Sequence, residues 1–91
     1  MNEDQHRFLL QLAHPPARFT VEQTAWALNC QKHDIPVLVT ARLLKHLGDP
    51  PANGTKFFCS ADILELATNR VWLGKMTDAI YKHWRHKNGT E

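Results

Sequence analysis

Apolar residues recur at helical spacing in two segments near the start of the chain. The first predicted helix covers residues 2–13, with Asn2 as its N-cap, and it ends at His14 because two consecutive prolines follow. Its apolar face consists of Phe8, Leu9, Leu12 and Ala13. A second helix is predicted to begin after Thr20, since Thr20 and Gln23 have the spacing of a capping box. Its core-facing residues are Val21, Ala25 and Leu28.

The next apolar segment allows two interpretations. A third helix is predicted to begin near Asp34, its N-cap, with Pro36 in the first turn, where the missing N–H is tolerated. Either this helix continues to Gly48, or it ends near Ala41 and residues 43–47 form a short strand. The apolar positions that fit the longer helix are Ile35, Leu38, Val39, Leu43 and Leu47.

Turn residues and two further helices follow. Residues 48–54 are rich in glycine and proline and predict a loop, and the β-branched and aromatic residues at 55–58 predict a strand. Ser60 is the predicted N-cap of a fourth helix, and Asn69 is that of a last helix over residues 70–87. Apolar residues of this last helix repeat every four positions, at Trp72, Met76, Ile80 and Trp84.

The composition fits one small domain spanning residues 1–91, with 43% hydrophobic residues and a net charge of +2. This charge excludes a strongly basic nucleic-acid-binding tail, but it allows a local basic surface. No apolar run approaches the roughly 18 residues of a membrane span, and the acidic start is unlike a signal peptide. We therefore expect a cytoplasmic protein with no membrane partner, in which Cys30 and Cys59 are reduced, half-buried thiols.

Three short motifs within residues 18–68 resemble one family. Residues 19–28, FTVEQTAWAL, resemble the aliphatic-Thr-Val-Glu-Glu-x-Ala-x-x-Leu helix of excisionase-type and MerR-type winged helix-turn-helix DNA-binding domains. Residues 43–45 and 56–64 resemble the two wing strands of that family and the helix after them. The resemblance favours a third helix that ends near Ala41. It implies a mainly helical fold with a small two-stranded wing, to which the N-terminal and C-terminal helices are additions.

The same resemblance implies a DNA-binding protein, either a small transcriptional regulator or an excisionase-like architectural factor. Its partner would be double-stranded DNA, with an integrase or the transcription machinery as a protein partner. The helix at residues 34–41 is expected to enter the major groove. Val37 is expected to face outward together with Pro36, and three roles fit this apolar pair: contact with thymine methyl groups, a protein-binding patch, or a surface covered by the N-terminal or C-terminal helix. The residues expected to contact DNA are Arg18, Lys32, His33, Val37, Thr40, Arg42, Lys45, His46 and Lys56.

The sequence departs from the family's pattern in three places, and the lack of bases in residues 34–41 favours an alternative function. Residues 34–41 contain one acid and no base, and the loop between the expected wing strands lacks the usual cation. Arg42 occupies a position that is often glycine in the family, and a positive φ there would strain it. The alternative is a protein-interaction module that keeps this scaffold and has little affinity for DNA.

The last helix holds the positive excess of the chain. Its cations are Arg70, Lys75, Lys82, Arg85 and Lys87, against the acids Asp78 and Glu91. Three roles fit this helix: contact with DNA phosphates, a homodimer seam through its apolar stripe as in MerR-type regulators, or a core helix with a solvated basic face. The sequence has no phosphate-binding glycine loop, paired carboxylates or cysteine-protease signature, so we expect no enzyme, no cofactor and no metal site.

Overall fold

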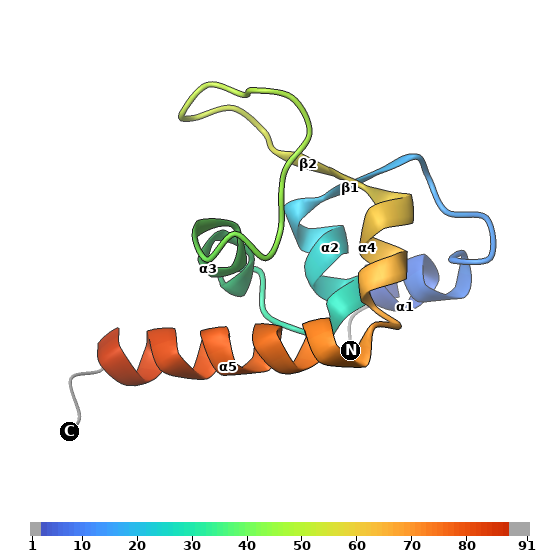
Figure 1. Cartoon of the computed structure of the whole chain (residues 1–91). Helices are drawn as coiled ribbons and strands as arrows, with labels where there is room; N and C mark the ends of the chain where they lie inside the picture. Colours follow the sequence, from blue (N-terminus) through green and yellow to red (C-terminus); the bar gives the residue numbers. More distant parts are fainter. Residues whose placement is uncertain (1–2, 88–91) are drawn as a thin grey trace.

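The computed structural model describes residues 3–87, in which it places five helices and two short strands (Figure 1). The elements in chain order are α1 (Glu3–Leu10), β1 (Arg18–Thr20), α2 (Val21–Leu28), α3 (Asp34–Thr40), β2 (Phe57–Cys59), α4 (Ser60–Leu66) and α5 (Arg70–Lys87). The described chain is therefore mainly helical with a small sheet, as the sequence predicts. Figure 1 shows α5 along one side of the molecule, and the long loop of residues 41–56 beyond α3 on the other side.

The sheet consists of β1 and β2, which pair antiparallel with Phe19 opposite Phe58. Both phenylalanines are almost completely buried, because paired residues point to the same face of a sheet. The strand predicted at residues 43–47 is wrong. Leu47 alone in that segment is bonded to β2, through its N–H to the carbonyl oxygen of Phe57 at 2.8 Å. The sequence reasoning missed β1, which is the actual partner of β2.

A tight turn after α3 explains the missing strand. Arg42 has a φ of 64°, in the left-handed region that favours glycine. The N–H groups of Leu43 and Leu44 then both donate to the carbonyl oxygen of Leu38, at 2.9 and 3.2 Å. These two amides are therefore not available for pairing with a strand. Arg42 thus has a positive φ at a position that is often glycine in the family that residues 18–68 resemble.

Two of the helix caps that the sequence predicts are confirmed. Thr20 accepts a bond from the Gln23 N–H at 3.1 Å, and the Gln23 side chain accepts one from the Thr20 N–H at 3.0 Å, so the capping box is confirmed. Asn69 accepts a bond from the Trp72 N–H at 3.0 Å and begins α5 as predicted. The predicted cap at Ser60 is wrong, because this residue is the first of α4 and its hydroxyl donates to a carbonyl before β1.

The first helix is shorter than predicted. α1 ends at Leu10, three residues before Ala13, and the predicted cap Asn2 lies outside the described residues. Phe8 is the buried residue of α1, and its ring centroid lies 5.2 Å from that of Phe19 and 5.5 Å from that of Trp26. These aromatic contacts attach α1 to the start of the domain core.

The apolar stripe of α5 packs within the same chain. Trp72 and Met76 are buried, and the Trp72 indole N–H donates to the carbonyl oxygen of Leu43 at 3.0 Å. Further along the helix, the Trp84 indole N–H donates to the Asp34 carboxylate at 2.8 Å. Trp72 and Met76 are therefore used within the chain, whereas Ile80 and Trp84 are only half-buried, so a homodimer through this stripe stays a prediction.

Candidate nucleic-acid interface

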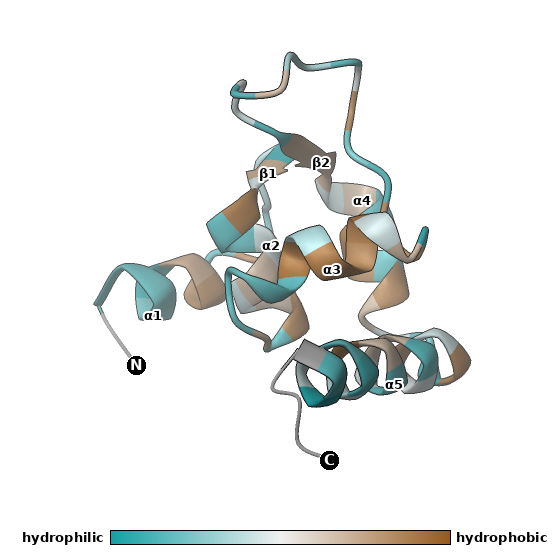
Figure 2. Cartoon of the chain, turned by 90° about the vertical axis from the view of Figure 1, so that its left-hand side faces the viewer, coloured by the Kyte–Doolittle hydropathy of each residue, from teal (hydrophilic) through white to brown (hydrophobic). Residues whose placement is uncertain are grey.

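The exposed side of α3 is small and mostly apolar. Ile35 and Leu38 are buried in the core, whereas Pro36 and Thr40 are exposed. Val37 is half-buried, which corrects the expectation that it faces outward together with Pro36. Figure 2 shows α3 facing the viewer, mostly in brown, with the long loop above it and α5 below. The helix is therefore a short apolar ridge with a single hydroxyl group on its exposed side.

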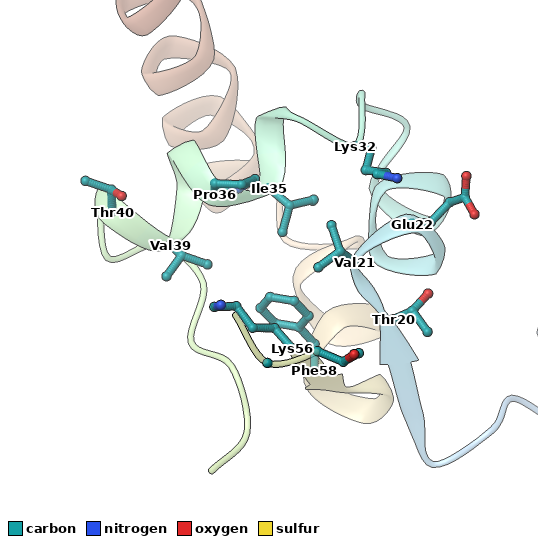
Figure 3. Close-up of a pocket in the computed structure, with 12 residues that line it drawn as sticks. Thr20, Val21, Glu22, Lys32, Ile35, Pro36, Val39, Thr40, Lys56 and Phe58 are labelled. Atoms are coloured by element: carbon teal, nitrogen blue, oxygen red, sulfur yellow. The ribbon is translucent and has the colours of Figure 1, made fainter. Parts of the chain in front are cut away.

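A groove of about 700 Å³ lies between α3, the start of α2 and the segment before β2. Its apolar lining includes Val21, Ile35, Pro36, Val39 and Phe58. Lys32 and Lys56 reach this groove from different sides, and Glu22 lies on the same side as Lys32 (Figure 3). We call it the loop-side groove. Three of the predicted DNA contacts, Lys32, Thr40 and Lys56, thus line this groove.

A second groove, of about 500 Å³, separates α3 from α5, and we call it the helix-side groove. From α3 and its C-cap it is lined by Pro36, Val37, Thr40 and Ala41, and from α5 by Ala79, Lys82, His83 and Trp84, with His33 also in the lining. Pro36 and Thr40 therefore line both grooves. The exposed ridge of α3 stands between two hollows, and each hollow contains at least one lysine.

The Asp34 carboxylate accepts hydrogen bonds that hold α3 against α5. Asp34 is only 5% exposed and is the first residue of α3, so the prediction that it is the N-cap is wrong. One carboxylate oxygen accepts the Gln31 N–H at 2.9 Å, and the other accepts the Trp84 indole N–H at 2.8 Å. The rings of His33 and His83 both meet Trp84 edge to face, at centroid distances of 5.1 and 4.7 Å. Because a buried carboxylate needs such partners, this network sets the position of α5 beside α3.

The remaining predicted contacts do not join the two grooves. Arg18 lies on β1 with its guanidinium carbon 4.0 Å from the centroid of the Phe57 ring, outside both groove linings. Arg42 and Lys45 are exposed in the segment that follows α3. His46 is half-buried, and its Nδ1 atom is buried without a hydrogen-bond partner in the described residues, so this nitrogen faces the protein.

The environment of Cys30 keeps its thiol protonated. The side chain is half-buried and follows α2. Burial raises the pKa of the Cys30 thiol from 9.0 to about 12, and the negative charge of Asp34 adds to the increase. The nucleophilic form of a cysteine is the thiolate, so Cys30 at neutral pH is a poor nucleophile. As expected from the sequence, both Cys30 and Cys59 are half-buried free thiols.

Comparison with known protein families, with curated proteins and with solved structures finds no match for this chain. Between residues 3 and 87, no helix combines the length and the apolar character that crossing a membrane requires. The same residues contain no group of three or more His, Cys, Asp or Glu side chains placed to hold a metal ion.

Proposed function

We propose that this chain is a DNA-binding protein with a winged helix-turn-helix arrangement, in which α3 enters the major groove. In this assignment α2, the turn at residues 29–33 and α3 form the helix-turn-helix, and the loop at residues 41–56 acts as the wing. The observation that carries the proposal is the exposed ridge of α3 with a lysine-bearing groove on each side. A small transcriptional regulator or an excisionase-like architectural factor fits this size and arrangement.

Phosphate contacts supply the affinity in this proposal. Lys32, Arg42, Lys45 and Lys56 lie on or near the two ends of α3 and on the loop after it. Lysine and arginine side chains beside an inserted helix bind the phosphates and fix its register on the duplex. Glu22 in the loop-side groove opposes this attraction, so the proposed contact is weaker than that of a purely basic surface.

Base contacts in this proposal are mainly apolar. Pro36 and Val37 have no hydrogen-bonding groups at their side chains, and Thr40 has a single hydroxyl. Such a helix cannot make the bidentate bonds by which arginine or asparagine reads a purine. It can contact the 5-methyl group of thymine, which projects into the major groove. We therefore propose that the sequence preference of α3 depends on thymine methyl groups.

The test is the salt dependence of binding to duplex DNA. Four phosphate contacts give a slope of about −3.6 in log K against log salt, or a loss of about 150-fold between about 50 and 200 mM salt. Lys32→Ala and Lys56→Ala are each expected to lower the magnitude of this slope by about one. Arg7→Ala is the matched control, since it removes an exposed cation from α1. No binding of the unmodified chain at about 50 mM salt would contradict the proposal.

The loop-side groove favours a second candidate function. Five of its lining residues are apolar side chains, and grooves of this size and character commonly receive apolar ligands or peptide side chains. A protein-interaction module would use Val21, Pro36 and Val39 for such a contact. It would show no steep salt dependence toward DNA, so the same titration separates the two functions.

A further inference from the structure

One edge of α5 carries cations that face the exposed side of α3. Residues 75, 79, 82 and 86 follow the helical spacing of a single stripe, which lies beside the buried stripe of Trp72 and Met76. Lys75, Lys82 and His86 on this stripe are exposed. We call the stripe of residues 75, 79, 82 and 86 the basic edge of α5.

The helix-side groove shows which way the basic edge points. Ala79 and Lys82 line this groove together with Pro36, Val37 and Thr40 of α3. The edge therefore borders the ridge of α3, on the side away from Lys56, which lines the other groove. Lys75 does not line this groove, but it precedes Ala79 by about one helical turn on the same stripe.

Hydrogen bonds at two points hold this border in place. The Trp72 indole bonds to the Leu43 carbonyl near one end of the contact, and the Trp84 indole bonds to Asp34 at the other. Lys75 and Lys82 lie between these anchors along α5, so both lysines are presented from a fixed helix. Asp78, four residues before Lys82, forms no ion pair with Lys82 or Lys75. Both lysines are thus available to a partner, although Asp78 offsets part of their positive charge, as Glu22 does in the loop-side groove.

We propose that the basic edge of α5 is a second phosphate-binding surface for the DNA that α3 enters. This inference rests on the proposed function. The phosphate backbones line both sides of a major groove about 12 Å wide, so a helix inserted there meets phosphates on each side. Lys32 and Lys56 serve the side of the loop, and Lys75 and Lys82 serve the opposite side. The cations of α5 thereby supply charge that α3 itself lacks.

The experiment uses the full chain and a duplex DNA titrated at several salt concentrations. Lys82→Ala and Lys75→Ala are each expected to weaken binding at about 50 mM salt by several-fold and to lower the magnitude of the salt slope by about 0.9. The double variant is expected to lower it by about 1.8. Arg70→Ala is the matched control, because Arg70 is an exposed cation of α5 that lines neither groove. It is expected to leave the slope unchanged.

The outcomes separate the two proposals. Steep salt dependence in the unmodified chain, together with unchanged slopes in both lysine variants, would overturn the role of α5 and leave the proposed function in place. An equal decrease for Arg70→Ala would also overturn it, since the effect would then follow net charge rather than position. Absence of DNA binding by the unmodified chain would overturn both proposals. All three replaced side chains are exposed, and circular dichroism checks that each variant keeps its helix content.

Discussion

Replacing Trp84 by phenylalanine removes one hydrogen bond and keeps the aromatic ring. The indole N–H of Trp84 donates to the Asp34 carboxylate at 2.8 Å, and Asp34 is only 5% exposed. In Trp84→Phe the carboxylate keeps its second bond, from the Gln31 N–H at 2.9 Å. One oxygen of a nearly buried carboxylate is then left without its partner. The variant is expected to lose stability and to loosen the contact between α3 and α5.

The expected size of the loss follows from the type of bond. A hydrogen bond to a charged group contributes about 1.5–3 kcal/mol to folding. Trp84 itself is half-buried, so water can partly replace the lost donor, and we expect a loss of about 1.5 kcal/mol, at the low end of that range. For a domain of this size, 1 kcal/mol changes Tm by about 4–8 °C. Trp84→Phe is therefore expected to melt about 6–12 °C below the unmodified chain.

The assay is thermal and urea unfolding followed by circular dichroism, with Tyr81→Phe as the control on the same helix. Tyr81 is 64% exposed, and removing its hydroxyl is expected to change the free energy of unfolding by less than about 0.5 kcal/mol. A double-mutant cycle with Asp34→Asn isolates the pair, because the amide accepts only one of the two donors. Additive losses in the cycle, or a loss for Trp84→Phe no larger than that of the control, would refute the reasoning.

Three further predictions follow from individual residues. Arg42 has a φ of 64°, so Arg42→Gly is expected to be about 1 kcal/mol more stable than Arg42→Ala in urea unfolding, and equal stabilities would contradict the strain argument. The pKa of Cys30 is raised to about 12, so its alkylation at pH 8 is expected to be roughly a thousandfold slower than that of a thiol with the ordinary pKa of 9.0. The protonated Cys30 thiol contributes fully to the stability of the fold below pH 9, and this contribution is lost as the pH rises through about 12. Alkylation of the folded chain at the rate of the unfolded chain would contradict the raised pKa of Cys30. In a duplex selected for tight binding, replacing a contacted thymine by uracil is expected to weaken binding up to about fourfold at an unchanged salt slope, whereas equal affinities at every position would exclude methyl contacts.

Local signals in the sequence predicted the helices well. The capping pairs Thr20 with Gln23 and Asn69 with Trp72 act over three residues, so the chain alone specifies where α2 and α5 begin. The four-residue repeat of Trp72 and Met76 predicted the buried side of α5. These features depend on spacing along one helix and require no knowledge of the rest of the fold.

The errors concern contacts between distant segments. β2 pairs with residues about 40 positions earlier in β1, and residues 43–47 gave no sign that the amides of Leu43 and Leu44 donate to the Leu38 carbonyl oxygen. The hydrogen bond between Asp34 and Trp84 joins residues that are 50 positions apart, so nothing in the sequence indicated it. Asp34 was therefore predicted to be an N-cap, because it is an acid at the start of a helix. The sequence placed Lys32, Thr40 and Lys56 at the candidate site. It did not pair α3 with Lys82, because only the packing of α5 brings them to the same groove.

The positions of the positive charges, rather than their number, support the proposal that this chain binds DNA. A net charge of +2 is small, and α3 contributes no base to it. The structure places Lys56 in the groove on one side of the α3 ridge and Lys82 in the groove on the other. Charges near a surface act mainly within about one Debye length, close to 8 Å at physiological salt, so local lysines matter more than the sum over the chain. An apolar helix with cations at its flanks is suited to take affinity from phosphates and sequence preference from methyl groups.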